Sequence, residues 1–261
     1  MPADPPAPLP LAVNELGAGP PMIVLHGLLG RARNWLTVAR SLDGRYAMTL
    51  ADLRNHGASP WSPEMDYPAL AADVAALIAA RGGRATLLGH SMGGKTALAL
   101  ALTRPELVER LILVDIAPVT YADHNATYIK ALLGVDLAAI GKRADAEAAL
   151  RPAVPDPAMR GFLLQNLEPR PGEGFAWQPN LPALLAAMPQ LTAFPQDLLA
   201  RRWEGPAFCI RGARSDYVQP EGEAALRRVL PQIEILTMPD AGHWPHSERP
   251  AEFLAMLERC L

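Results

Sequence analysis

The segment that most constrains this chain is residues 85–95, where a short apolar run leads into Gly-His-Ser-Met-Gly and then into an Ala/Leu-rich stretch. A G-x-S-x-G pattern between a strand and a helix requires glycine at both ends, because the chain turns too sharply there for a Cβ atom. Such a turn holds the serine strained and exposed beside the helix N-terminus. The segment therefore predicts a strand, a tight turn that presents Ser91, and a helix over about residues 95–102.

Short apolar runs elsewhere predict the other strands of a parallel sheet, whose buried strands read as continuous hydrophobic segments. These runs, with a further edge strand, lie at residues 11–16, 22–25, 47–50, 86–88, 111–114, 208–210 and 233–236. Helical patterns alternate with them at residues 35–42, 67–80, 97–102, 221–230 and 251–257. Asp66 is the expected N-cap of the second helix. The alternation predicts an α/β fold, with a mostly parallel sheet covered by helices on both faces.

Residues 119–203 interrupt this alternation with several short, proline-punctuated helical pieces and no strand-like run. Asp-Pro at residues 156–157 and Asn-Leu-Pro at residues 180–182 predict helix starts. An insertion of small helices between two strands of such a sheet lies over the carboxyl ends of the strands, where ligands bind. We therefore expect these residues to form a helical cap that shapes a substrate pocket; the open alternative is a helical excursion without a binding role.

This interpretation divides the chain into a core of residues 1–118 and 204–261 and a cap of residues 119–203, inserted between the last strands of the sheet. Apolar side chains of the cap are then expected to influence which substrates the pocket accepts. Examples of such positions are Leu132, Phe162 and Leu185.

The composition argues against several classes of protein. Half of the 261 residues are hydrophobic and 20% are charged, as in globular proteins. The net charge of −3 argues against a nucleic-acid groove or a polybasic membrane patch. Cys209 and Cys260 lack metal-ligand and disulfide-scaffold spacing, so we expect no metal. No apolar stretch approaches the ~20 residues that a membrane span needs. Residues 1–10 are proline-rich and lack the pattern of a signal peptide. We therefore expect a cytoplasmic protein. The sequence leaves its oligomeric state open.

A serine hydroxyl is a weak nucleophile at neutral pH and needs a base to take its proton. Of the six histidines, His243 is best placed, because it follows the last apolar run in a glycine-containing loop, and the base comes last in this strand–helix order. His26 and His56 lie in loops where we expect them to organise the backbone, and His90 is expected to point away from the nucleophile. His246 could suggest a metal pair with the base, but no third ligand supports it.

The acid that orients the imidazole has two candidates, Asp115 and Asp216, each at the end of an apolar run. Both strand ends border the same crevice, so a carboxylate can reach the histidine from either one. Spacing alone leaves the choice open.

Four segments together carry a specific resemblance. They are residues 52–59 (Asp-Leu-Arg-Asn-His-Gly-Ala-Ser), 89–95 (Gly-His-Ser-Met-Gly-Gly-Lys), 114–118 (Val-Asp-Ile-Ala-Pro) and 241–244 (Ala-Gly-His-Trp). Over about residues 21–261 the chain resembles the α/β-hydrolase superfamily, and within it the branch of the bacterial esterase YbfF and abhydrolase domain-containing protein 11. The resemblance implies a helical cap, esterase or acyl-CoA thioesterase chemistry, and no cofactor.

The resemblance also bears on the acid. Most α/β-hydrolases carry it after the strand that follows the cap, three residues beyond a glycine. Counted from Gly212, that position is Ser215, and Asp216 comes one residue late. Members of the resembled branch take the acid from the end of the preceding strand, which corresponds to Asp115. We therefore favour Asp115, with Ser215 as a polar neighbour of the histidine.

An oxyanion hole needs two backbone N–H groups aimed at the developing negative charge. The residue after the nucleophile, Met92, supplies one. By resemblance Leu28, in the loop after the first strong strand, supplies the other and lines the acyl side of the pocket. The polar loop of residues 52–57 could be a phosphate or carboxylate clamp, but we expect it to support the site from behind.

The sequence thus predicts a serine hydrolase that cleaves a small-molecule carboxylic ester or acyl thioester, such as an acyl-CoA, through Ser91, His243 and Asp115 and an acyl-enzyme. Two alternatives stay open. One is a cofactor-free perhydrolase or carbon–carbon bond hydrolase with the same triad, and the other is a non-catalytic homologue that only binds ligands.

Overall fold

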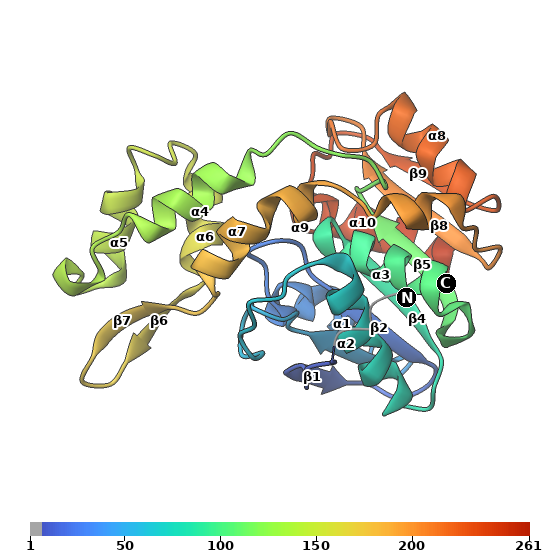
Figure 1. Ribbon diagram of the computed structural model, residues 1–261, viewed down its shortest axis with the longest axis horizontal. Helices are drawn as coiled ribbons and strands as arrows, with labels where there is room; N and C mark the ends of the chain where they lie inside the picture. Colours follow the sequence, from blue (N-terminus) through green and yellow to red (C-terminus); the bar gives the residue numbers. More distant parts are fainter. Residues whose placement is uncertain (1–6) are drawn as a thin grey trace.

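A seven-stranded sheet, in the order β1-β3-β2-β4-β5-β8-β9, lies at the centre of the protein (Figure 1). The computed structural model describes residues 7–261; residues 1–6 of the proline-rich segment and of the predicted core lie outside the described residues. The edge strand β1 runs antiparallel to β3, and the other pairings are parallel. The strands are β1 (Val13–Leu16), β2 (Pro21–Leu25), β3 (Ala47–Ala51), β4 (Ala85–His90), β5 (Val108–Val114), β8 (Ala207–Gly212) and β9 (Glu234–Met238). Each coincides with a predicted run, so the mostly parallel sheet is confirmed.

Helices cover both faces of the sheet, as the alternating pattern predicts. One face carries α2 (Tyr67–Ala79), α3 (Met92–Thr103) and α8 (Pro220–Val229); the other carries α1 (Leu36–Ser41), α9 (Pro245–Glu248) and α10 (Pro250–Cys260). Successive strand side chains point to opposite faces. In β2, Ile23 and Leu25 pack into the first core and Met22 and Val24 into the second. Short 3₁₀ helices lie at Ala32–Trp35 and Pro105–Leu107, and two more, Leu137–Ala139 and Gln196–Ala200, lie in the chain between β5 and β8.

Predicted polar residues begin three of the helices. The carboxylate of Asp66 accepts a hydrogen bond from the N–H of Ala69 at 2.9 Å and caps α2. Asp156 and Asn180 cap the two helices that follow them in the same way. Because the first N–H groups of a helix have no partner inside it, each cap stabilises its helix by about 1 kcal/mol.

The chain between β5 and β8 forms the layer that extends to the left of the sheet in Figure 1. Its helices are α4 (Asn125–Leu133), α5 (Arg143–Leu150), α6 (Pro157–Leu164) and α7 (Leu181–Thr192). The expectation that this segment holds no strand is wrong, because β6 (Leu167–Arg170) and β7 (Gly174–Trp177) pair as an antiparallel hairpin. Its strands are four residues long and partly exposed, so they form no apolar run, and Gly172 and Gly174 take the positive φ angles of its turn.

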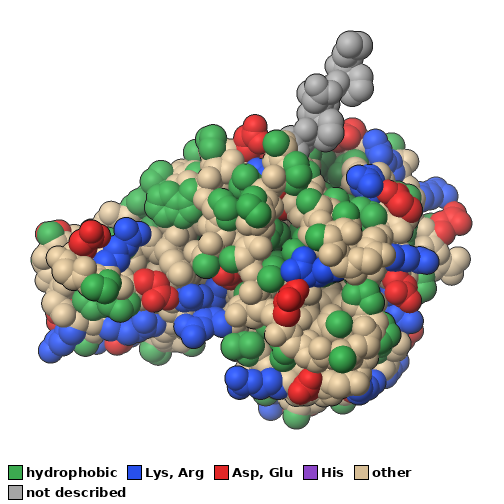
Figure 2. Space-filling model, turned by 90° about the horizontal axis from the view of Figure 1, so that it is seen from below, with side chains coloured by type: hydrophobic (Ala, Val, Ile, Leu, Met, Phe, Trp, Pro, Cys, Tyr) green, Lys and Arg blue, Asp and Glu red, His purple; other side chains and the backbone are tan. Residues whose placement is uncertain are grey.

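On the face drawn in Figure 2, basic and acidic side chains are interspersed, with hydrophobic side chains between them. Within residues 7–261, every helix is too short or too polar to cross a bilayer.

Candidate active site

Ser91 stands at the turn between β4 and α3, as the glycine spacing predicts. Its φ of 52° and ψ of −119° lie outside the regions that non-glycine residues normally occupy. Backbone hydrogen bonds hold it in place, because its N–H donates to the carbonyl of Val114 at 3.1 Å and its carbonyl accepts from the N–H of Lys95 at 3.0 Å. The strain is therefore fixed by the neighbouring strand and by the first turn of α3.

The glycines around Ser91 are required by close packing. A Cβ atom on Gly93 would lie 2.5 Å from the carbonyl oxygen of Leu25, and one on Gly89 would collide with the carbonyl oxygen of Gly93. Gly27, in the loop after β2, approaches the same turn, since a Cβ there would lie 3.3 Å from that of Ser91. The absence of these side chains brings the loop after β2 directly beside the serine.

Asp115 and His243 come together at the carboxyl ends of β5 and β9. The Nδ1–H of His243 donates to Oδ2 of Asp115 at 2.7 Å. The hydroxyl of Ser215 donates to the same oxygen, and the N–H of Gly212 donates to Oδ1 at 3.0 Å. Asp115 is fully buried and has a φ of 51°. Three donors thus fix both oxygens of one carboxylate against the imidazole.

The second acid candidate lies elsewhere. Asp216 is exposed on the loop after β8, whereas its neighbour Ser215 is buried against Asp115. Ser215 therefore contacts the imidazole indirectly, through the carboxylate. The register that pairs Val114 of β5 with Ile210 of β8 sets this arrangement, since it places Gly212 next to Asp115.

Two aromatic neighbours hold His243 in place, one through its imidazole and the other through its backbone. The ring of Tyr217 stacks on it, with centroids 3.6 Å apart and planes at 14°. The Nε2–H of His90 donates to the backbone carbonyl of His243 at 2.8 Å. Burial, above all, keeps the pKa of His90 well below 6.5, so His90 remains a neutral donor. The expectation that His90 points away from the nucleophile missed this contact, because nothing in the local sequence indicates that His90 reaches the loop after β9.

Leu28 and Met92 line the same small cavity as Ser91. Met92 is the first residue of α3, where N–H groups have no partner inside the helix. Leu28 lies within a tight turn closed by the N–H of Gly30, which donates to the carbonyl of Gly27 at 2.9 Å. The next residue, Leu29, has a φ of 58°. Both predicted oxyanion donors thus belong to backbone segments of fixed conformation.

Two buried histidines join the loop after β2 to the loop after β3. His26 of the first loop accepts the N–H of Leu53 on Nε2 at 3.0 Å, and His56 of the second accepts the N–H of Leu29 on Nε2 at 3.1 Å. Each ring donates its Nδ1–H to a backbone carbonyl, of Gly27 and of Arg54 respectively. Burial lowers the pKa of both and brings that of His56 to about 3, so that Nε2 stays an acceptor. The expectation that these histidines organise the backbone is confirmed.

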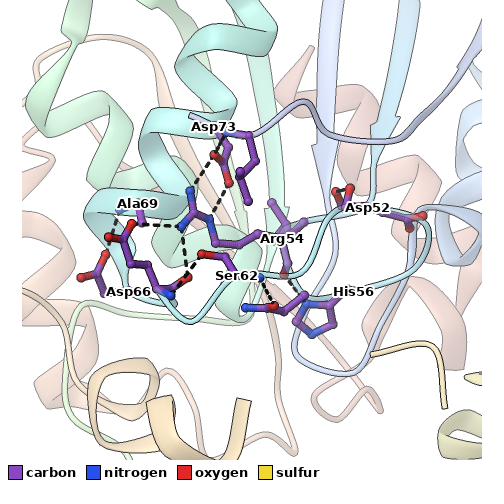
Figure 3. A network of polar contacts seen from close by, with 12 residues as sticks. Asp52, Arg54, His56, Ser62, Asp66, Ala69 and Asp73 are labelled. Carbon is purple, nitrogen blue, oxygen red and sulfur yellow. Dashed lines mark hydrogen bonds and ion pairs between the residues drawn. The ribbon is translucent and has the colours of Figure 1, made fainter. Parts of the chain in front are cut away.

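The polar loop of residues 52–57 is a support and not a clamp. The guanidinium of Arg54 is fully buried and points at the carboxylate of Asp73 (Figure 3), to which Nε and Nη2 donate at 2.7 and 2.8 Å. Asp52 accepts the N–H groups of Ala32 and Ala58. Because the charged side chains of the loop are bonded to other groups of the protein, none is free for a phosphate or carboxylate ligand.

A cavity of about 250 Å³ opens above Ser91 and His243. Side chains from the insertion, including Tyr128 of α4 and Phe162 of α6, form one wall. Further lining residues come from the loops after β2 and β9, the latter including Trp244. No cluster of three or more His, Cys, Asp or Glu residues suited to a metal occurs within residues 7–261.

Known proteins share this architecture. A model of the alpha/beta hydrolase family matches residues 22–256. The sn-1-specific diacylglycerol lipase ABHD11 of Mus musculus is 39% identical over 95% of this chain and 83% of its own length. Esterase YbfF of Escherichia coli is 33% identical over 92% of each chain. The structure of a marine microorganism esterase superposes with a TM-score of 0.93, at 30% identity over 97% of this chain and all of its own.

Proposed function

The chain belongs to the alpha/beta hydrolase family, two of its relatives are named a lipase and an esterase, and we propose that it cleaves carboxylic esters or acyl thioesters with Ser91 as nucleophile, His243 as base and Asp115 as acid. The hydrogen bond of 2.7 Å between His243 and the buried carboxylate of Asp115 carries the proposal. A carboxylate on Nδ1 leaves Nε2 free to accept a proton, which is the tautomer that a serine nucleophile needs.

In the first half of the reaction, the hydroxyl oxygen of Ser91 attacks the acyl carbon while Nε2 of His243 takes its proton. The imidazolium that forms is stabilised by Asp115. It then gives the proton to the leaving alcohol or thiol as the bond to the acyl carbon breaks. The product of this half is an ester between Ser91 and the acyl group.

In the second half, water replaces the leaving group. His243 removes a proton from the water as it attacks the acyl carbon, and returns the proton to the hydroxyl of Ser91 as the acid is released. The enzyme is then restored, and the net reaction consumes one molecule of ester or thioester and one of water.

The negative charge on the substrate oxygen in both halves would be met by the backbone N–H groups of Leu28 and Met92. Such donors bind most strongly in the transition state, where the charge develops, and one of them stabilises it by about 2.7–4 kcal/mol. The contact of His56 with the N–H of Leu29 supports this role, because it fixes the conformation of the residue next to Leu28.

The test is turnover of p-nitrophenyl acetate by the purified protein. We expect hydrolysis that begins with a burst of p-nitrophenol equimolar with the enzyme, because each molecule carries one Ser91. Turnover should be lost in Ser91→Ala. A folded protein that binds esters without turning them over would instead be a ligand-binding homologue.

A further inference from the structure

Ser91 lies between two cavities of very different size. The outer cavity, of about 250 Å³, is the one that contains His243. The inner cavity, of about 30 Å³, lies between α3 and the insertion. Both are lined by Leu28, Ser91, Asn125 and Tyr217. A substrate bound at Ser91 can therefore extend in two directions.

Given the proposed function, the position of His243 determines which cavity takes the leaving group and which takes the acyl chain. His243 must protonate the leaving group, so the leaving group lies in the outer cavity beside it. The substrate oxygen points to the N–H groups of Leu28 and Met92. The remaining substituent of the acyl carbon is the acyl chain, and the inner cavity, lined by the side chains of Leu28 and Met92, is the space that remains for it.

We propose that the inner cavity is the acyl site and that it limits the enzyme to short acyl groups of acetyl or propionyl size. About 10–15 Å³ of such space holds one water molecule, so the inner cavity has room for only two or three heavy atoms. The outer cavity, about eight times larger, takes the leaving group.

The floor of the inner cavity is built to stay closed. Tyr67, Met188 and Leu191 are each at most 6% exposed. The hydroxyl of Tyr67 donates to the carbonyl of Leu191 at 2.7 Å, which ties α2 to α7. Longer acyl chains would have to displace these side chains from a packed core, which costs more than the extra methylene groups contribute.

Lys95 closes the remaining side of the floor. Its ammonium group is buried and donates to three backbone carbonyls, of Val119, Thr192 and Ala193, at 2.8–2.9 Å. It also lies 4.6 Å from the ring centroid of Tyr121. These bonds hold the beginning of the insertion and the end of α7 to the helix that follows Ser91. Because three carbonyls surround the ammonium, it is not free to pair with a charged acyl group.

The outer cavity selects an uncharged, partly apolar leaving group. Aromatic rings line it, among them those of Phe162 in α6 and Trp244 in the loop after β9, whose centroids lie 6.0 Å apart. Among the described residues, those that line it include no lysine or arginine. The inferred substrate class is therefore the short-chain ester of an uncharged alcohol.

The experiment measures kcat/KM for p-nitrophenyl esters from acetate to octanoate, and for acetates of alcohols of increasing size. The native protein should prefer acetate to octanoate by about 10-fold or more, since a single methylene in a tight pocket changes kcat/KM by about 10–200-fold. Met188→Ala, which enlarges the inner cavity, should shift this ratio about 10-fold towards longer chains. Phe162→Ala is the matched control: it should change the preference among alcohols and leave the acyl ratio within about 2-fold.

The outcomes separate this inference from the proposed function. Preference of the native protein for octanoate would overturn the acyl assignment while leaving the hydrolase intact, and so would an acyl ratio that changes in Phe162→Ala and not in Met188→Ala. Absence of turnover for every ester, with no fluorophosphonate adduct on Ser91, would overturn the proposed function itself. If Met188→Ala does not fold, the chain-length profile of the native protein still decides.

Discussion

Replacing Asp115 by asparagine tests the proposed acid, because the structure fixes how the new amide would orient. The N–H of Gly212 donates to Oδ1 of Asp115 at 3.0 Å, so the amide oxygen of asparagine must take that position. The NH₂ group then replaces Oδ2, which in the native protein lies 2.7 Å from Nδ1 of His243. The NH₂ group therefore faces Nδ1. An NH₂ group can only donate there, so the imidazole must carry its proton on Nε2.

The expected loss is large because that tautomer cannot accept the proton of Ser91. In a serine protease the same exchange lowers kcat by about 10⁴-fold. At about 1.36 kcal/mol for each factor of ten, the barrier rises by about 5.4 kcal/mol. Turning the amide around would not rescue activity, since the NH₂ group would then face the N–H of Gly212, two donors with no acceptor between them.

The assay compares kcat for p-nitrophenyl acetate in Asp115→Asn and in the matched control Asp216→Asn. Asp216 is exposed, so its variant should keep kcat within about 2-fold of the native value. Circular dichroism and urea titration establish that both variants are folded. A greater loss in Asp216→Asn than in Asp115→Asn, with both folded, would refute the assignment of the acid.

Three predictions concern the stability of the site. His56→Ala should lower the free energy of unfolding by about 1–3 kcal/mol, because the buried N–H of Leu29 loses its acceptor; an unchanged urea midpoint would contradict this. Burial lowers the pKa of both His56 and His246 to about 3, below the 6.5 of an exposed histidine. Below pH 6.5 the unfolded chain therefore binds protons that the folded protein excludes, and stability should fall with falling pH by about 1.4 kcal/mol per pH unit for each histidine. Urea titrations at pH 6 and 5 should show that slope reduced by this amount in His246→Phe, and an identical slope would count against it. Gly93→Ala should yield no folded protein, because its Cβ would lie 2.5 Å from the carbonyl oxygen of Leu25; a folded, active variant would disprove the packing argument.

The strands and the serine turn could be predicted from the sequence because their signals are local. Buried parallel strands need continuous apolar runs, and the turn at Ser91 needs glycines at fixed spacing. The hairpin of β6 and β7 could not be predicted from apolar runs, since its four-residue strands are half exposed and one of them contains Pro169. Its signal was the pair Gly172 and Gly174, which permits a tight reversal.

The partner of His243 could not be settled from spacing, because it depends on contacts between distant segments. Asp115 lies 128 residues before His243, and the pairing of β5 with β8 decides which acid reaches the imidazole. The sequence also did not show which of the apolar residues at 119–203 line the pocket. Phe162 lines the outer cavity, whereas Leu132 and Leu185 pack into the core.

The central claim is that Ser91 is the nucleophile of a hydrolase, and covalent labelling tests it most directly. A fluorophosphonate reacts only with a serine that a neighbouring base activates. After incubation of the folded protein, mass spectrometry of its peptides should find one adduct, on Ser91, and its formation should abolish ester turnover in parallel. An unlabelled Ser91 in protein that still hydrolyses esters, or an adduct on another residue that accounts for the lost activity, would contradict the claim.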